Sequence, residues 1–581
     1  MTERSKPNRT LSMDQGPPPA ARASAHRWLE SYPPDVDWAA EIPAAPAWKL
    51  MADAVARFAD RPCVDFLDRR FTYREIGDLV DRAAKGLAGL GVKSGTKVGL
   101  FLPNCPYSVI FYFAVLKAGG TVVNFNPLYA ERELAAQIED SETDIMVTLD
   151  LATLHDKIAA LLGGTRLRQV IVCPMQAALP FPRNLLFALA MNRRLTRLPA
   201  DGRHSSFRRL VDNDGALEPR SIDPRREIAL LQYTGGTTGT PKGAMLTHAN
   251  IHANAVQCAR WFTEVRPGGE RMVGVLPLFH VFAMTAVMNW SLLFGAEMIL
   301  LPRFQLERLL RAIHRKRATA IAAVPTILTA INNFPQIKRY DLSSLRVCLA
   351  GGAALPLEVQ RAFEARTGCR VLQGYGLSEC SPVVTCNPMA GPPKPGSIGL
   401  PYPQTVVEIM SLERPARPRP IGEKGEICGS GPQVMAGYWR RPEETATTIV
   451  DGRLHTGDVG YMDDDGYFFI ADRLKELINA AGFKVYPRMV EEAIHTHPAV
   501  AECAVIGVPD PYRGETVKAF VMLTAGRTLT AEALSAFLVD KLSPIEIPKQ
   551  IEFRPALPKT AVGKIDKKAL VAEGATKELA G

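Results

Sequence analysis

The sequence predicts an α/β fold: a large N-terminal α/β domain of several subdomains, one of them β-rich, followed by a small α+β C-terminal domain. The chain has 581 residues, which is too many for a single compact core. Most of it alternates short apolar strands with segments of helical periodicity, a pattern typical of parallel α/β layers. After about Gly396 the pattern changes to short strands separated by turns.

The alternation can be followed along the N-terminal domain. Helical spacing that ends in glycine predicts helices over 71–92 and 107–120. Apolar runs that end in polar turns predict strands over 97–103, 121–127 and 144–150. Further apolar segments of the same kind lie at 271–278, 297–302, 319–328, 345–355 and 369–376.

Domain boundaries follow from these changes in pattern. Residues 1–27 are polar and proline-rich, and we expect a disordered leader there. Residues 28–474 are the expected N-terminal domain, with its β-rich subdomain at about 396–474, and residues 475–581 are the expected C-terminal domain. The C-terminal elements that we expect are a helix at 487–497, strands at 500–510 and 516–524, and a helix at 530–542.

Composition excludes several classes of protein. No apolar run approaches the ~18 residues of a membrane-spanning helix, and the N-terminus lacks the apolar core of a secretory signal. The ten cysteines form no CxxC pair and no metal-ligand spacing, which argues for a reducing cytosol and against disulfides or a structural zinc. The net charge of +9 suits an anionic ligand or membrane surface without selecting either. We expect no nucleic-acid partner.

A loop rich in glycine and threonine, YTGGTTGTPKG, spans residues 233–243. Glycine lets backbone N–H groups turn outward, threonine hydroxyls add donors, and Lys242 adds a mobile positive charge, so the loop can surround a polyphosphate. The strict P-loop pattern GxxxxGK[ST] is absent, because Lys242 follows proline and precedes glycine. We therefore expect a phosphate-binding loop that does not pass directly into a helix.

One segment interrupts the alternation: residues 179–204 are both apolar and rich in arginine. If the segment is one helix, Arg183, Arg193, Arg194 and Arg197 fall within an arc of roughly 100°. Such a helix can lie in the interface of an anionic membrane. The alternative is a surface helix that packs its apolar face on its own domain. The apolar residues outside the arc are Leu185, Phe187, Leu189, Met191, Leu195 and Leu198, whereas Leu186 intrudes on it.

The loop and seven later motifs resemble one enzyme superfamily. YTGGTTGTPKGAMLTH is similar to the signature loop of the adenylate-forming acyl- and aryl-CoA synthetases, relatives of firefly luciferase and of peptide-synthetase adenylation domains. The resemblance extends from about Phe71 to Leu570 through LPLFHVFAM, LAGGAAL, QGYGLSECSP, GSIGLP, GEICGSGPQVMAGYW, GRLHTGDVGYMDDDGYFFIADRLKELINAAGFKVYP and PKTAVGKIDKKAL. LQYTGGTTG, NPLY, GFKVYP and the inserted LPFPRNLLF are most similar to bacterial long-chain fatty acid–CoA ligases.

The resemblance implies that a fatty acid, expected to be long-chain, is activated in two steps. Its carboxylate attacks the α-phosphate of ATP and gives acyl-AMP and pyrophosphate, and the thiol of CoA then displaces AMP. Cations and oriented N–H groups must offset the repulsion between the two anions of the first step. ATP, Mg²⁺ and the co-substrate CoA are thus the implied cofactors, with Glu379 as the Mg²⁺ ligand.

The resemblance also implies a nucleotide site. Tyr375 would lie against adenine, and Asp458 would accept hydrogen bonds from the ribose hydroxyls, with Arg473 donating to the same ribose. The family often has threonine where this chain has Ser378, and the hydroxyl is retained. The implied ATP- and AMP-binding residues are Thr234, Gly235, Gly236, Thr237, Thr238, Gly239, Lys242, Gly351, Gly352, Tyr375, Gly376, Ser378, Asp458 and Arg473.

Lys564 is implied as the catalytic lysine of the first step, together with Lys242 and Glu379. The small C-terminal domain is implied to be mobile and to swing about a hinge at Lys475. One orientation presents Lys564 for adenylation. The other presents the AGFKVYP loop, in which Gly482 lines the path of the pantetheine thiol.

The acyl pocket and the location are further expectations. His280 resembles a position that borders the acyl pocket near the carboxylate, and a histidine satisfied within the core is the alternative. Other functions left open are a medium-chain or aryl acid–CoA ligase, an acyl-AMP ligase that loads a carrier protein, and a non-catalytic membrane-bound acyl-binding protein. We expect a cytoplasmic protein, peripheral on the inner face of an anionic membrane through residues 179–204, with a homodimer as an open alternative to a monomer.

Overall fold

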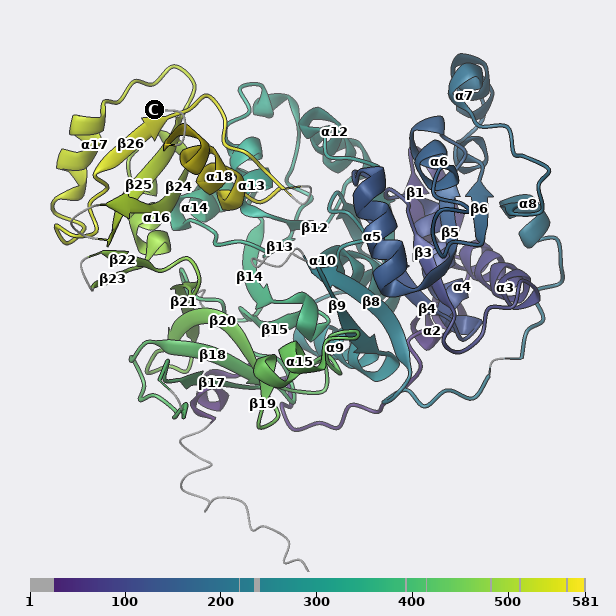
Figure 1. Ribbon diagram of the computed structural model, residues 1–581, viewed down its shortest axis with the longest axis horizontal. Helices are drawn as coiled ribbons and strands as arrows, with labels where there is room; N and C mark the ends of the chain where they lie inside the picture. Colours follow the sequence, from purple (N-terminus) through teal and green to yellow (C-terminus); the bar gives the residue numbers. More distant parts are fainter. Residues whose placement is uncertain are drawn as a thin grey trace, which may run out of the picture.

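The computed structural model describes residues 26–218, 220–234, 241–391, 394–413, 415–480, 483–510, 514–560 and 563–578. The expected disordered leader, residues 1–27, lies outside these ranges except for His26 and Arg27. The described residues form four sheets. Two of these sheets are large and belong to the N-terminal part of the molecule, and the C-terminal residues form a unit at one end of it (Figure 1).

One large sheet has seven strands, which pair in parallel except for the antiparallel hairpin of the last two. The predicted strands at 97–103, 121–127 and 144–150 are confirmed in it. In spatial order the strands are β7 (His204–Ser206), β6 (Gln169–Cys173), β5 (Thr143–Leu149), β3 (Lys97–Leu100), β4 (Thr121–Asn124), β8 (Ile228–Thr234) and β9 (Lys242–Thr247).

The other large sheet has nine strands, and its central strands are parallel. Each predicted apolar segment from 271 to 376 contributes one strand to it, so the predicted parallel α/β layers are confirmed. In spatial order the strands are β16 (Leu400–Pro401), β15 (Val383–Cys386), β14 (Arg370–Gly376), β13 (Val347–Ala350), β12 (Ala320–Ala323), β10 (Arg271–Gly274), β11 (Glu297–Leu300), β1 (Pro62–Phe66) and β2 (Arg69–Thr72).

The helices of the N-terminal part begin and end where local chemistry allows. Helix α3 (Tyr73–Gly89) begins with a capping box in which the Thr72 hydroxyl accepts from the Glu75 N–H and the Glu75 carboxylate accepts from the Thr72 N–H. Helix α4 (Pro106–Lys117) is buried from Pro106 to Leu116, as expected for a helix that is apolar all round. The other main helices are α2 (Lys49–Phe58), α5 (Glu131–Ser141), α6 (Ala152–Ala159), α9 (His248–Trp261), α12 (Leu306–Lys316), α13 (Pro325–Asn332) and α14 (Leu357–Thr367).

A third, antiparallel sheet corresponds to the predicted β-rich segment. Strand β20 pairs with β18 on one side and β21 on the other, and the β18–β20 pair brings the motif that begins GEICGSG against the motif that begins GRLHTGD. The strands are β17 (Val406–Met410), β18 (Gly425–Ser430), β20 (Arg453–Met462), β19 (Ile449–Val450) and β21 (Phe468–Arg473), with the short helix α15 (Pro442–Thr448) between β18 and β19.

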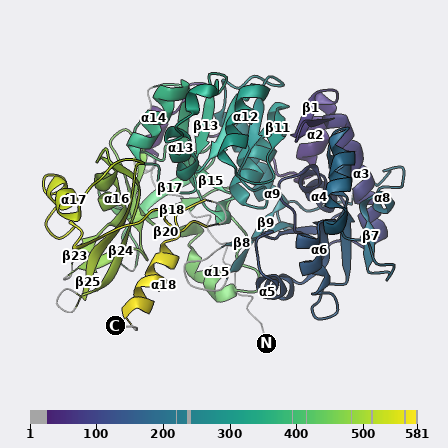
Figure 2. The ribbon, with the colours of Figure 1, turned by 90° about the horizontal axis from the view of Figure 1, so that it is seen from above.

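The C-terminal residues form the fourth sheet and have a hydrophobic cluster of their own. This cluster runs from Ile478 to Leu538 among the described residues, which is close to the predicted domain boundary at 475. Figures 1 and 2 show this unit at the opposite end of the molecule from the seven-stranded sheet. Its elements are β22 (Ile478–Ala480), β23 (Phe483–Val485), α16 (Pro487–His495), β24 (Val500–Asp510), β25 (Gly514–Leu523), α17 (Ala531–Leu538), β26 (Gln550–Phe553) and α18 (Lys567–Glu578).

The basic apolar segment 179–204 differs from the prediction. Helix α7 (Arg183–Met191) is short, and the four arginines do not share one helical face. Arg193 and Arg194 lie in a 3-10 turn (Asn192–Arg194), and Arg197 lies in the extended chain that follows. The helix ends early because this extended chain pairs with the sheet region, where the Thr196 N–H donates to the Asp150 carbonyl.

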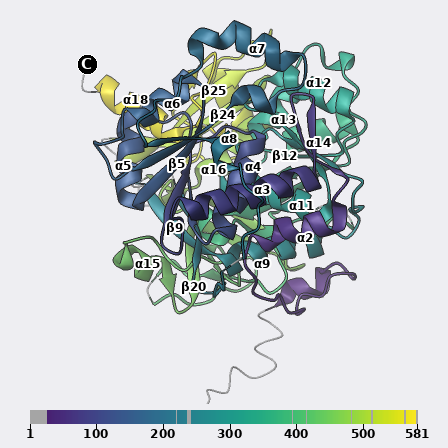
Figure 3. The same cartoon turned by 90° about the vertical axis from the view of Figure 1, so that its right-hand side faces the viewer.

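The alternative prediction for this segment, an apolar face packed on its own domain, is met only in part. No residue of α7 is buried, and Figures 1 and 3 show the helix at the outer surface of the molecule. Phe187 alone within α7 packs partly against the main core. The exposed large apolar side chains of the segment are Phe181, Leu185, Leu186, Leu189 and Leu198. No helix in the described part of the chain is long and apolar enough to span a bilayer.

Candidate active site

A cavity of about 1040 Å³ lies at the carboxyl ends of β13 and β14, where parallel α/β sheets place their ligands. The β8–β9 hairpin, the third sheet and the C-terminal unit complete its wall. The cavity brings together these predicted site residues: Thr234, Lys242, His280, Gly351, Gly352, Tyr375, Gly376, Ser378, Glu379, Asp458, Arg473, Lys475 and Lys564. The predicted residues Gly235, Gly236, Thr237, Thr238, Gly239 and Gly482 lie outside the described part of the chain.

The ends of the glycine- and threonine-rich loop are held by a hairpin. Thr234 is the last residue of β8 and pairs across the sheet with Lys242, the first residue of β9. The Lys242 ammonium lies 5.2 Å from the centre of the Tyr438 ring and 3.9 Å from the Glu444 carboxylate. The loop therefore leads into a strand, and its lysine is held at the edge of the cavity.

Glu379 occupies a short 3-10 turn (Ser378–Cys380) beside this lysine. The Tyr438 hydroxyl donates a 2.8 Å hydrogen bond to Glu379 Oε1 and orients the carboxylate. No hydrogen bond between described residues involves Glu379 Oε2, so one anionic oxygen in the cavity wall is left for a ligand. A hard cation such as Mg²⁺ prefers such an oxygen and takes few protein ligands, so the residues fit the ion.

Asp458 is the centre of a polar group on the third sheet. Its Oδ2 accepts a 2.6 Å hydrogen bond from the Tyr375 hydroxyl, and its Oδ1 lies 3.1 Å from Arg473 Nε. Asp458 and Arg473 are cross-strand partners on β20 and β21. Burial raises the pKa of the Asp458 carboxyl, and the Arg473 guanidinium and the Tyr375 hydroxyl partly offset this effect. The carboxylate is thus fixed by donors and presented at the cavity wall.

Two of the predicted glycines stand where a side chain would clash or would strain the backbone. A Cβ on Gly376 would lie 2.0 Å from the Pro382 carbonyl oxygen. Gly352 has a φ of +80°, and a Cβ there would lie 3.2 Å from Lys564 Cε. These glycines therefore allow the backbone and the lysine to approach the space in which a ligand would lie.

Lys564 reaches the cavity from the C-terminal unit. A local turn holds it, because its N–H donates to Thr560 Oγ1 and its carbonyl accepts from the Thr560 N–H. The Thr326 hydroxyl, on α13, donates a 2.6 Å hydrogen bond to the Gly563 carbonyl and joins this turn to the N-terminal part. Burial and the nearby Arg473 guanidinium lower the pKa of Lys564 to about 8.

His280 lines the cavity and is neutral at physiological pH. Burial, reinforced by the Lys564 ammonium, lowers its pKa to about 3. Its Nδ1 accepts from the Phe282 N–H at 3.4 Å, which assigns the ring proton to Nε2. The neutral imidazole can therefore donate one hydrogen bond to an oxygen of a ligand.

Part of the cavity lining is apolar, and we refer to it as the apolar branch. It extends between α9, the π-helical segment η4 (Met284–Asn289) and the nine-stranded sheet, which together supply side chains without charge. Ala286 and Trp290 form part of its wall. The lining residues of this branch are Cys258, Phe262, Phe282, Ala286, Trp290, Leu349, Leu372, Val383, Cys386 and Tyr402.

Sequence reasoning missed three groups in this cavity. Tyr438, which orients Glu379, lies within GEICGSGPQVMAGYW, so a signal was present in the motif. Lys559 and Thr560 line the cavity beside Lys564 and lie within PKTAVGKIDKKAL, so a signal was present in that motif as well. The apolar branch had no signal, because its residues come from separate segments that each read as ordinary core.

Comparison with known proteins finds relatives along most of the chain. Residues 51–439 match the AMP-binding enzyme family, and residues 489–564 match the AMP-binding enzyme C-terminal domain. The chain is 44% identical over 549 residues to a long-chain-fatty-acid–CoA ligase of Bacillus subtilis (strain 168), which covers 94% of this chain and 98% of the relative.

Two solved structures are similar as well. The anthranilate CoA ligase AuaEII in complex with anthranoyl-AMP has a TM-score of 0.81 and 26% identity, covering 92% of this chain and 98% of that one. ATP-bound MatB from Rhodopseudomonas palustris has a TM-score of 0.78 and 28% identity, covering 90% and 98%. The likeness therefore spans both the N-terminal part and the C-terminal unit.

Proposed function

We propose that the acid activated by this chain is a long-chain fatty acid. The premise is that the chain belongs to the AMP-binding enzyme family and is an acid–thiol ligase that uses ATP, Mg²⁺ and CoA. The observation that carries the substrate class is the apolar branch of the cavity, which His280 and Lys564 also line. An apolar chain lies favourably in such a branch, because its transfer from water contributes about 0.8 kcal/mol per buried CH₂ group. The Bacillus subtilis relative supports the same class.

We propose that the nucleotide lies at the carboxyl ends of β13 and β14. Asp458 accepts hydrogen bonds from the ribose hydroxyls, and Arg473 donates to the same sugar. Tyr375 is fixed by its bond to Asp458 and presents its ring to adenine. Gly351, Gly352 and Gly376 leave room for the base, and Thr234, Ser378 and Lys242 face the phosphates from the opposite wall.

In the first step the chain must bring a carboxylate to a phosphate. The neutral His280 donates Nε2–H to one carboxylate oxygen and orients it without adding charge. Lys564 lies between this carboxylate and the α-phosphate, and Lys242 holds the pyrophosphate that leaves. Mg²⁺, when bound at Glu379, would supply further positive charge to the phosphates. Electrostatic stabilisation by such prepositioned groups is commonly the largest part of catalysis of this kind.

In the second step the C-terminal unit would turn about Lys475 and withdraw Lys564. Its separate hydrophobic cluster supports a movement as one body, and the Thr326–Gly563 bond is one of the contacts that such a movement would break. The AGFKVYP segment would then guide the thiol of CoA toward acyl-AMP. The role of Gly482 in that path stays a prediction, as does the homodimer.

We further propose that α7 and the segment after it rest on an anionic membrane surface. Leu185 and Leu189 are 50% and 79% exposed, and Phe181 next to the helix is 78% exposed. Arg193 and Arg194 lie beside these apolar residues, and no ion pair between described residues involves either of them. Exposed apolar side chains with unpaired arginines suit acyl chains and anionic headgroups.

The test of the substrate class is AMP release that depends on ATP and CoA, measured over acids from acetate to oleate, with benzoate and cinnamate included. A maximum at long chains is the expected result. A maximum at medium-chain or aromatic acids would keep the ligase chemistry and overturn the substrate class. Transfer of the acyl group from acyl-AMP to a carrier protein instead of CoA would overturn the assignment of CoA as the acceptor. Binding of the acid without release of AMP would indicate a non-catalytic protein.

A further inference from the structure

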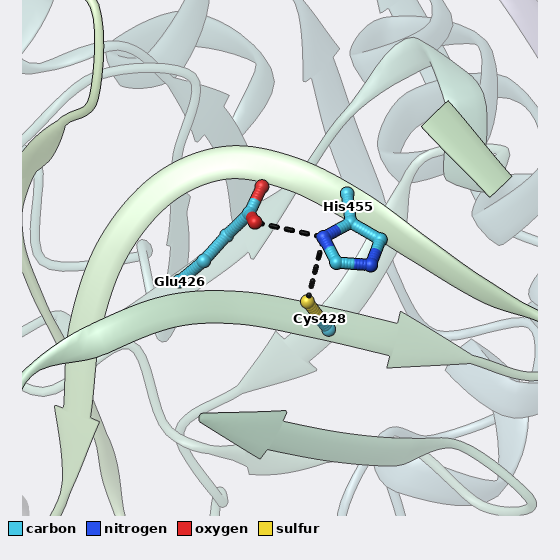
Figure 4. Close-up of side chains that lie close together, drawn as sticks. All are labelled: Glu426, Cys428 and His455. Carbon is cyan, nitrogen blue, oxygen red and sulfur yellow. Dashed lines mark hydrogen bonds and ion pairs between the residues drawn. The ribbon is translucent and has the colours of Figure 1, made fainter. Parts of the chain in front are cut away.

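Three side chains with metal-binding atoms meet on the third sheet, and none of them is used in the proposed reaction. His455 Nδ1 lies 2.7 Å from Glu426 Oε2 and 3.5 Å from Cys428 Sγ (Figure 4). All three ligand atoms lie within 4.8 Å of one another, and no other such group is found among the described residues. Cys428 is buried, and the other two side chains are about one-tenth exposed.

The sheet itself brings these residues together. Glu426 and Cys428 are two positions apart on β18, so their side chains share one face of the strand. Cys428 and His455 are direct cross-strand partners on β18 and β20, at the distance at which side chains of a pair touch. The group is therefore placed by strand pairing and does not depend on a flexible loop.

The arrangement does not suit nucleophilic catalysis by the cysteine. In a relay, one imidazole nitrogen faces the nucleophile and the other faces the carboxylate. Here the same atom, Nδ1, faces both Cys428 and Glu426, and Figure 4 shows the second ring nitrogen pointing away from them. Burial and two nearby carboxylates also raise the pKa of the Cys428 thiol, so a reactive thiolate is disfavoured.

We propose that Glu426 Oε2, Cys428 Sγ and His455 Nδ1 bind a soft divalent transition metal of the zinc class. In a tetrahedral site with Zn–S of about 2.3 Å and Zn–N of about 2.0 Å, sulfur and nitrogen are about 3.5 Å apart. The Cys428–His455 separation of 3.5 Å already matches this value. The shorter Glu426–His455 separation is a hydrogen bond, and the carboxylate needs to move by well under 1 Å to make room for the ion.

The charges of the ligands suit a divalent cation, and the nearest other charges form an ion pair. Glu408, on β17, is the cross-strand partner of Cys428 on the side opposite His455, and its carboxylate pairs with Arg453. Glu426 and the thiolate of Cys428 then supply two negative charges to the ion, which balances a divalent metal. A coordinating thiol loses its proton on binding, so its raised pKa does not prevent ligation.

The site adjoins the proposed ribose contact. Glu426 Oε1 accepts a 3.0 Å hydrogen bond from the Gly457 N–H, and Gly457 directly precedes Asp458. His455 is three positions before Asp458 on the same strand. An ion held by β18 and β20 would therefore fix the strand that carries Asp458, and three protein ligands leave one of its four positions for water.

The test is metal binding by the untagged full-length protein after treatment with a chelator, in the absence of nucleotide. We expect one Zn²⁺ per chain in equilibrium dialysis, and a thiolate-to-metal charge-transfer band in the near ultraviolet when Co²⁺ is used. C428S should abolish the band. E426Q and H455Q should each weaken binding by more than the ~10–100-fold that loss of an outer-shell partner costs.

The matched control is C503S. Cys503 is likewise buried on a strand and lies near a carboxylate, that of Glu491, but it belongs to no metal-binding group. This variant should bind Zn²⁺ as the parent protein does.

Thermal unfolding in chelator checks that each variant folds. Added Zn²⁺ should raise the melting temperature of the parent protein and of C503S, but not that of the ligand variants. If C428S does not fold, the loss of binding in E426Q decides. Unchanged stoichiometry and affinity in the ligand variants, or no cobalt–thiolate band in the parent, would overturn the proposal.

Discussion

Cε of Lys564 lies 3.2 Å from the position that a Cβ would take on Gly352. The lysine of the C-terminal unit and the glycine after β13 are therefore in contact in the arrangement that the structure describes. Glycine suits position 352 because φ is +80° there and a Cβ would displace Lys564 by a few tenths of an ångström. It marks the point at which the two parts of the molecule share one cavity.

Gly352→Ala should slow acyl-AMP formation by about tenfold or more, because an added Cβ displaces Lys564 and each ~1.4 kcal/mol of lost stabilisation is tenfold in rate. The measurement is single-turnover formation of acyl-AMP. Gly91→Ala is the matched control, since Gly91 has a φ of +87° and open space around its Cβ position. An equal loss in both variants would assign the effect to backbone strain alone.

Lys564→Ala should abolish acyl-AMP formation and largely spare the capture of preformed acyl-AMP by CoA. The reason is that, in the proposed reaction, the lysine neutralises charge in the first step and leaves the cavity before the second. The two half-reactions are measured separately, with Lys541→Ala as the control. Lys541 is an exposed lysine of the same unit, stacked on Phe537. Equal loss in both half-reactions would contradict the assigned role.

The rate of adenylation at low ATP should fall as the pH rises above about 8. The pKa of Lys564 is lowered to about 8, so its ammonium is present below that pH and is lost as the pH rises through it. Bound ATP, which is an anion, should move the fall to higher pH in kcat. We expect Lys564→Arg to abolish the fall, because a guanidinium stays protonated to above about pH 12. A decline that persists in this variant would assign it to another group.

Ala286→Leu should shift the preference toward shorter acids. Ala286 is buried in η4 and lines the apolar branch, so a larger side chain takes space from the acyl chain. Loss of one or two methylene positions in a hydrophobic pocket is worth about 1–3 kcal/mol, so kcat/KM for the longest acids should fall roughly tenfold or more. Ala312→Leu, on α12 and outside the cavity, controls for overpacking of the core. An unchanged chain-length profile would place the acyl chain elsewhere.

Replacing Phe181, Leu185 and Leu189 by serine should reduce binding to anionic vesicles without altering the melting temperature. These side chains are exposed, so their replacement should change the free energy of unfolding little. Cosedimentation with vesicles of anionic and of neutral lipid measures the effect. Leu128→Ser is the control, because Leu128 is 73% exposed but lies outside this segment. Unchanged binding would leave α7 as an ordinary surface helix.

The proposed metal site shows a limit of prediction from the spacing of ligands in the sequence. The cysteines form no close pair in the sequence, and on that ground a structural zinc was not expected. Cys428 and His455 are nevertheless neighbours, because β18 and β20 pair across an intervening helix and strand. The spacing of ligands in a sequence detects metal sites whose ligands lie on one local turn. It misses sites whose ligands come together only when distant strands pair.

Segment 179–204 shows the limit of helical periodicity. Its arginines and leucines predicted one amphipathic face, but the helix ends at Met191. The chain after it is held by hydrogen bonds to the neighbouring strand region, and such tertiary contacts outweigh the small differences in helix propensity. The pattern correctly indicated a surface that is both apolar and basic, but it wrongly placed these residues on one helix.

By itself the sequence determined the order of strands and helices, the fold class and the candidate residues for a nucleotide site, because apolar periodicity, glycine positions and motif residues are local properties of the chain. Tertiary structure alone decided which distant residues meet. It placed Lys564 against Gly352, Tyr438 on Glu379, and Cys428 beside His455, and it opened an apolar branch among residues that otherwise read as core. The physical reason is that strand pairing and domain packing set these contacts, and both depend on the whole chain.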